Sequence, residues 1–110
     1  MPRSRLLPPA ARWSDLVTNG YGLAWQARFA AAHHKPIAFP EWGEVIATST
    51  PGLGGGDDPY FIEQMRRWFA SHQTAFEDYF NSDTSYGTYY GIDTGSGKFP
   101  TASATYRSLW

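Results

Sequence analysis

The sequence predicts an α/β fold in which helices and strands alternate along a chain of 110 residues. Residues 36–42 and 74–80 are short apolar or aromatic runs, and each lies between two stretches with helical periodicity. Long polar loops follow both runs, whereas the turns that follow the helices are very short. This alternation is typical of parallel strands that are joined by crossover helices.

Composition favours a packed protein and limits its partners. The chain is 42% hydrophobic and 17% charged, with a formal net charge of −1, so neither nucleic acid nor a membrane is expected as the main partner. It has no cysteine, which excludes disulfides and thiolate metal sites. Its 5 Trp, 7 Tyr and 7 Phe can pack a core or stack on flat ligand faces, including those of sugars. The apolar run at Leu6 and Leu7 is too short for a signal-peptide core, so the chain as given is expected to carry no export signal.

Three segments have the features of helices. Residues 21–34 are rich in alanine and end at Pro36, and residues 59–72 begin with a suitable N-cap, Asp58, before a proline. Residues 100–109 form the third predicted helix. Residues 1–20 hold three prolines and are predicted to be irregular, with 1–10 as a lead-in.

Glu41 stands at the end of the first predicted strand. Side chains alternate along a strand, which places Ile37, Phe39 and Glu41 on one face and Trp42 on the other. Long loops after strands and minimal loops after helices describe a (β/α)8 barrel, whose active site lies at the carboxyl ends of its strands. Ile37 and Phe39 would then fill the barrel interior, with Glu41 above them. The pattern alone leaves open a second interpretation, a loop glutamate exposed to solvent.

The stretch "KPIAFPEWG" at residues 35–43 is very similar to the seventh strand of glycoside hydrolase family 26, the β-mannanase-like enzymes. The likeness extends over residues 11–110, in the order sixth helix, seventh strand, seventh helix, eighth strand and eighth helix. It implies that residues 11–110 are the C-terminal part of a catalytic (β/α)8 barrel. No part of the chain resembles strands one to six.

The resemblance implies a retaining glycosidase in which Glu41 is the nucleophile. A second carboxylate, about 5–5.5 Å away, would act as acid and then as base. In the family the acid/base is a glutamate at the end of the fourth strand, and that strand has no counterpart in this chain. Three other glutamates were weighed for the acid/base role. Glu44 is too close to Glu41 in sequence to lie across a sugar from it, Glu63 is predicted on the outer side of a helix, and nothing else supports Glu77. We therefore expect the isolated chain to be inactive.

The resemblance also implies the substrate and the setting of the parent enzyme. The parent would be secreted, need no cofactor or metal, and hydrolyse β-linked polysaccharide, with mannan as the first expectation. Trp42, Tyr79 and Phe80, at the tops of the strands, are candidates for sugar stacking, although ordinary packing explains them as well.

Several alternatives remain at this level. A carbohydrate-binding module without catalysis fits the aromatic content, and a truncated reading frame with no function of its own fits the missing strands. Adjacent histidines on a helix, His33 and His34, do not converge and are not expected to bind a metal. An open part of a barrel is expected to self-associate through its exposed sheet edges.

Overall fold

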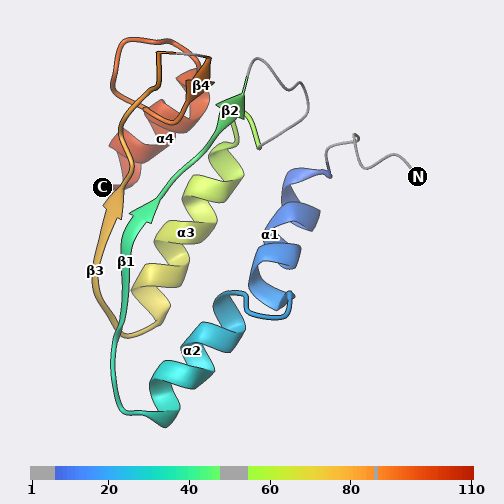
Figure 1. Ribbon diagram of the computed structural model, residues 1–110, viewed down its shortest axis with the longest axis vertical. Helices are drawn as coiled ribbons and strands as arrows, with labels where there is room; N and C mark the ends of the chain where they lie inside the picture. The colour runs from blue at the N-terminus through green and yellow to red at the C-terminus, as the bar shows by residue number, and fades with distance from the viewer. Residues whose placement is uncertain (1–6, 48–54, 86) are drawn as a thin grey trace.

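The chain folds into helices that cover one face of a small parallel sheet (Figure 1). The computed structural model describes residues 7–47, 55–85 and 87–110. Strands β1 (Ile37–Trp42) and β3 (Thr74–Tyr79) are parallel neighbours, and helix α3 (Pro59–Ser71) connects them. The remaining elements are α1 (Pro9–Thr18), α2 (Leu23–Ala32), β2 (Ile46–Ala47), β4 (Thr88–Tyr89) and α4 (Pro100–Leu109). The predicted α/β class with a parallel sheet is therefore confirmed.

The three predicted helices and the two predicted strands are present, with ends that differ by at most two residues. Helix α1 was not predicted, because its prolines indicated irregular chain. Pro9 in fact occupies the first helical turn, where its missing N–H costs nothing. The helix then packs Trp13, Leu16 and Val17 against the core. Of the predicted lead-in 1–10, residues 1–6 lie outside the described part of the chain.

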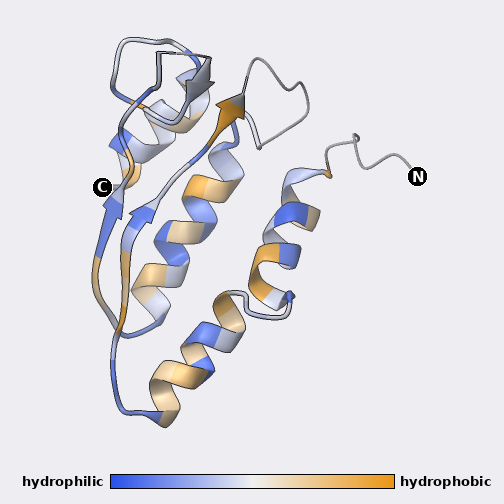
Figure 2. Ribbon diagram, viewed as in Figure 1, coloured by the Kyte–Doolittle hydropathy of each residue, from blue (hydrophilic) through white to orange (hydrophobic). Residues whose placement is uncertain are grey.

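The core lies between α3, the sheet and α4. Ile62 and Met65 of α3 are buried, three residues apart on one helix face. They join the other buried apolar side chains, which are Leu23, Trp42, Phe99 and Ala102. Apolar and polar segments alternate along the α3 ribbon, as expected for a helix with one buried side (Figure 2).

Strand β1 does not keep strict alternation. Its register to β3 runs from the pair Phe39–Glu77 to the pair Trp42–Tyr79, so three steps along β1 match two along β3. The irregularity falls at Pro40, which has no N–H to offer to the ladder. As a result Phe39 and Trp42 both contact Phe69 of α3, with ring centroids 5.2 and 5.4 Å away. The prediction that Phe39 faces away from the helices and shares a face with Glu41 was therefore wrong.

The loops that follow β1 and β3 meet at one end of the sheet. β2 and β4, one from each loop, form a short antiparallel pair in which Ile46 faces Tyr89 (Figure 1). Both segments were predicted to be irregular, since two-residue strands leave no periodic pattern. Residues 48–54, which include the first half of the predicted flexible stretch "PGLGGGDD" at 51–58, lie outside the described residues. The pairing brings together the carboxyl-end loops that carry the candidate site.

Two adjacent aspartates fix the starts of two helices. Asp58 is the predicted N-cap of α3 and accepts a hydrogen bond from the Phe61 N–H at 3.1 Å. Asp57 accepts from the Thr101 and Ala102 N–H groups, at 3.1 and 2.8 Å, in the first turn of α4. The segment before α3 therefore positions α3 and α4 together.

In the described part of the chain, no helix is long and apolar enough to cross a membrane.

Candidate active site

Glu41 lies at the carboxyl end of β1 and is exposed. It lines a hollow of about 360 Å³ whose other side carries Phe80, just after β3, and Tyr90, just after β4. The two rings pack edge to face, with centroids 5.1 Å apart. The Phe80 N–H donates to the Trp42 carbonyl at 2.8 Å, which holds the two sides together. The arrangement offers a free carboxylate next to an aromatic wall.

Of the three aromatic residues predicted for stacking, Phe80 is the one that the structure brings to Glu41 with an exposed ring. It is 36% exposed. Trp42 is only 7% exposed and packs against Phe61, Phe69 and Tyr79. Its indole lies in the core and has no free face for a sugar, because these rings cover it.

Tyr79 is half-buried and its hydroxyl is engaged on two sides. It accepts a hydrogen bond from the Glu44 N–H at 3.0 Å and donates to the Tyr90 carbonyl at 3.0 Å. Its ring packs edge-on against Trp42 at 5.0 Å. These contacts correspond to the packing interpretation of Tyr79, and the sequence held no signal for the hydroxyl's partners.

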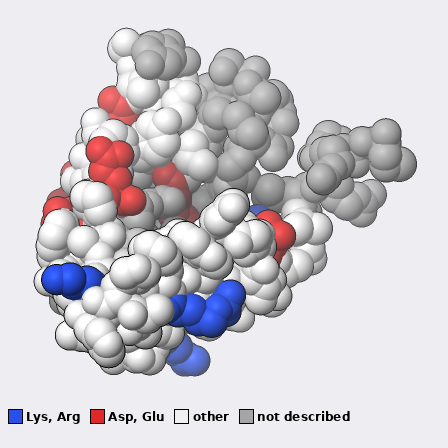
Figure 3. Space-filling model, turned by 60° about the horizontal axis from the view of Figure 1, so that its bottom comes forward, with Lys and Arg blue, Asp and Glu red and all other residues white. Residues whose placement is uncertain are grey.

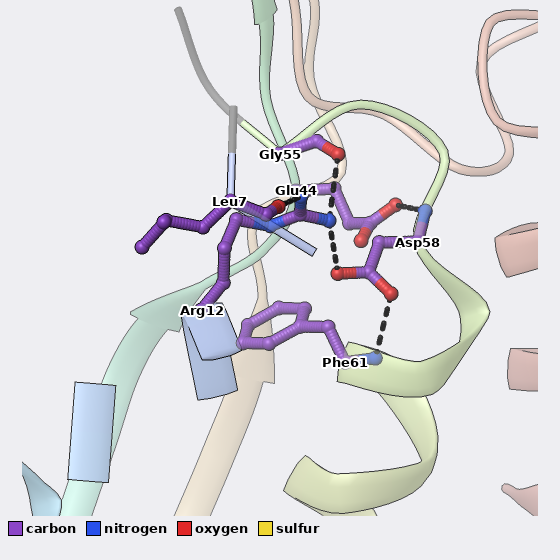
Figure 4. Close-up of polar contacts among 6 residues, drawn as sticks. All are labelled: Leu7, Arg12, Glu44, Gly55, Asp58 and Phe61. Carbon is purple, nitrogen blue, oxygen red and sulfur yellow. Dashed lines mark hydrogen bonds and ion pairs between the residues drawn. The ribbon is translucent and has the colours of Figure 1, made fainter. Parts of the chain in front are cut away.

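Glu44 is the second carboxylate beside the hollow, but its carboxyl group points into the protein (Figure 4). It is 4% exposed and accepts a hydrogen bond from the Asp58 N–H at 2.8 Å. Burial raises its pKa to about 8, and the negative charges of Asp58 and Asp57 act in the same direction. The sequence predicts no acid/base role for Glu44, and no local pattern indicates its burial.

Arg12 of α1 completes this polar cluster. Its guanidinium contacts Asp58 at 2.7 Å and donates to the Gly55 carbonyl at 3.2 Å (Figure 4). It also donates to the Leu7 carbonyl. Below the cluster, Arg12, Glu44, Asp58 and Phe61 help to line a cavity of about 170 Å³. The cluster thus ties α1 and the loop after β1 to the start of α3.

Glu77 and Glu63, the other carboxylates weighed from the sequence, lie elsewhere. Glu77 faces the helices, where it accepts a hydrogen bond from the Trp42 indole at 2.7 Å and another from the Trp110 indole at 2.9 Å. Glu77 therefore lies on the helix-covered face of the sheet and not on the opposite face. Glu63 is exposed on α3, as predicted.

A row of aromatic side chains that runs along α2 and includes one residue beyond each end of the helix was not predicted. Tyr21, Trp25, Phe29 and His33 recur every four residues, and successive ring centroids lie 5.0, 5.1 and 4.4 Å apart. Tyr21 and Phe29 are 76% and 52% exposed. Figure 3 shows a face on which most side chains are uncharged and the charged ones are scattered. The four-residue spacing is visible in the sequence, but the prediction of this helix rests on its alanine content and on Pro36.

No group of His, Asp and Glu side chains suited to a metal ion occurs among the described residues. His34 follows α2 with a φ of 55°, so the two histidines stand where the helix has already ended. No protein-family model, curated protein or solved structure matches the chain.

Proposed function

We propose that the chain is the C-terminal segment of a retaining β-glycanase of the glycoside hydrolase family 26 type, with Glu41 as its nucleophile. The observation that carries this proposal is the exposed carboxylate at the carboxyl end of a parallel strand, opposite the aromatic wall of Phe80 and Tyr90. The sequence of residues 35–43 supports it. In this proposal β1 and β3 are the seventh and eighth strands of a barrel.

The chemistry assigned to Glu41 is attack on the anomeric carbon of a β-linked sugar. The bond to the leaving oxygen breaks, and a glycosyl ester forms on the Glu41 carboxylate. A second carboxyl group must protonate the leaving oxygen and later activate water. Glu44 and Glu77 are held by other partners, so we assign neither to this role. The chain then supplies one half of a catalytic pair.

The assignment of Glu41 as nucleophile can be tested with a reagent whose leaving group needs no protonation. In a 2-deoxy-2-fluoro-β-mannosyl fluoride the anomeric C–F bond breaks, fluoride leaves as the anion, and an ester to Glu41 forms. Without a base to activate water, the ester should persist. Mass spectrometry of the intact chain should show the addition of one fluorosugar, and Glu41→Gln should show none. A wild-type chain that gains no mass would contradict the nucleophile assignment.

The same proposal predicts no steady-state turnover. An activated aryl β-mannoside should release its aryl group no faster with the chain than with Glu41→Ala, because the acid/base is missing. Sustained turnover that depends on Glu41 would contradict the claim that the chain lacks an acid/base, because it would require a second catalytic carboxylate within this chain.

The proposed ligand is a β-linked polysaccharide, with mannan first and mixed-linkage glucan or xylan next. No cofactor enters this chemistry. The parent enzyme would act outside the cell, where such polymers occur.

The second candidate function is a carbohydrate-binding module, and the exposed aromatic row on α2 favours it. A pull-down with insoluble mannan separates the two. A module would bind the polymer and lose binding in Tyr21→Ala and Phe29→Ala, while Glu41→Gln would bind normally. Covalent labelling of Glu41 by the fluoromannosyl fluoride would favour the glycanase over the binding module.

We also propose that isolated chains self-associate through the sheet. Phe76 on β3 is 52% exposed and pairs with the exposed Ala38 on β1. In the described residues β1 and β3 pair only with each other, so each strand keeps an open edge. Sedimentation velocity at about 100 µM should show dimers or larger species, and Phe76→Glu should shift them to monomers. A wild-type chain that stays monomeric would contradict this proposal.

A further inference from the structure

Tyr79 joins the two loops that form the hollow around Glu41. Glu44 belongs to the loop after β1, and Tyr90 belongs to the loop after β3. The Tyr79 hydroxyl accepts from the Glu44 N–H and donates to the Tyr90 carbonyl, both at 3.0 Å. A single hydroxyl therefore connects the side of the hollow that carries Glu41 with the aromatic side.

The position of the Tyr79 ring is fixed by its neighbours. Trp42 and Tyr106 contact it edge to face, with centroids 5.0 and 5.7 Å away. On another side Gly43 approaches so closely that a β-carbon at this position would lie 3.2 Å from Cζ of the tyrosine. Because the ring is held on these sides, the hydroxyl has a defined position between the loops.

The hydroxyl also keeps its proton. Burial raises the pKa of Tyr79 above its ordinary value, and the neighbouring Glu44 carboxyl acts in the same direction. The donor to the Tyr90 carbonyl is therefore present throughout the neutral and mildly alkaline range. The acceptor for the Glu44 N–H is present as well.

We propose that Tyr79 is a positioning residue for the Glu41 site, which sets the separation between the Glu41 carboxylate and the wall of Phe80 and Tyr90. This inference rests on the proposed function. The wall would hold the sugar, and the bridge would hold the wall at the distance that attack by Glu41 requires. Tyr79 thus acts through the two loops and not on the sugar itself.

Two substitutions test this role. Tyr79→Phe keeps the ring and removes the bridge. Tyr106→Phe is the matched control, because Tyr106 packs in the same cluster and its hydroxyl makes no hydrogen bond among the described residues. The first readout is hydrogen exchange at the Glu44 amide, which needs no ligand. The second is the rate of Glu41 labelling by the fluoromannosyl fluoride, measured over a range of concentrations.

We expect the Glu44 amide to exchange about tenfold faster in Tyr79→Phe, as the loss of one net hydrogen bond implies, and to be unchanged in Tyr106→Phe. The limiting rate of labelling should fall by about the same factor in Tyr79→Phe only. A merely structural loss would lower the limiting rate only in proportion to the folded fraction, which circular dichroism of the same sample measures independently.

The outcomes separate this inference from the proposed function. Wild-type chain that is not labelled would overturn the proposed function and the positioning role with it. If the wild-type chain and Tyr79→Phe are labelled at the same limiting rate, the positioning role alone is overturned. Unchanged exchange at Glu44 in Tyr79→Phe would overturn the bridge itself.

Discussion

Replacing Trp42 by alanine is expected to lower the free energy of unfolding by about 3–5 kcal/mol, a large fraction of the total stability. The indole is 7% exposed and contacts rings from α3, β3 and α4, so its removal leaves a cavity where these elements meet. Deletion of a buried tryptophan side chain costs about 3–5 kcal/mol, and small domains have about 5–15 kcal/mol in all. Circular dichroism and urea unfolding measure the loss.

Two further variants keep this prediction testable. Trp42→Phe retains a ring but loses the hydrogen bond from the indole to Glu77, and should cost about 2 kcal/mol. Tyr21→Ala, which removes an exposed ring, should cost less than about 1 kcal/mol. If Trp42→Ala unfolds at the same urea concentration as Tyr21→Ala, then Trp42 does not hold the core together.

The stability of the chain is expected to fall as the pH rises from about 4.5 to about 8. Glu44 has a pKa of about 8 in the folded chain and 4.5 as its ordinary value. Between these values the folded chain binds a proton that the unfolded chain has released, so the free energy of unfolding decreases with pH. At about 1.4 kcal/mol per pKa unit, the total decrease is on the order of 5 kcal/mol. Its main cause is the burial of the carboxyl group.

Glu44→Gln should remove most of this pH dependence, because the amide oxygen still accepts from the Asp58 N–H and carries no charge at any pH. The measurement is urea unfolding at pH 5, 6.5 and 8. Glu63→Gln, an exposed position on α3, should keep the wild-type slope. A wild-type free energy of unfolding that is constant or rises between pH 5 and 8 would contradict the buried carboxyl.

Local patterns predicted most of the regular structure. Asp58 followed by Pro59 located the start of α3, and Pro100 located the start of α4, because capping depends on neighbouring residues alone. Helix α1 was missed because its stability comes from contacts of Trp13 and Leu16 with the core. Such contacts follow from the tertiary fold and leave no local signal beyond a weak apolar spacing.

The site was predictable in part, where the place of a residue at the end of a strand is enough to locate it. Glu41 follows from its place at the end of a strand, and Phe80 from its place at the end of the next. Strict alternation places Trp42 on the face opposite Glu41, but it cannot foresee the register irregularity between β1 and β3 that brings Phe39 to the same side as Trp42. The burial of Glu44 and the bridge made by Tyr79 each join residues that lie far apart in the sequence.

The central claim is that Glu41, and no other carboxylate, is the nucleophile at this end of the sheet. Peptide mapping after reaction with the fluoromannosyl fluoride tests it most directly. We predict that fragment spectra place the single fluorosugar on Glu41, and that Glu44→Gln is labelled at the same residue. A sugar found on Glu44, on Glu77 or spread over several carboxylates would contradict the claim.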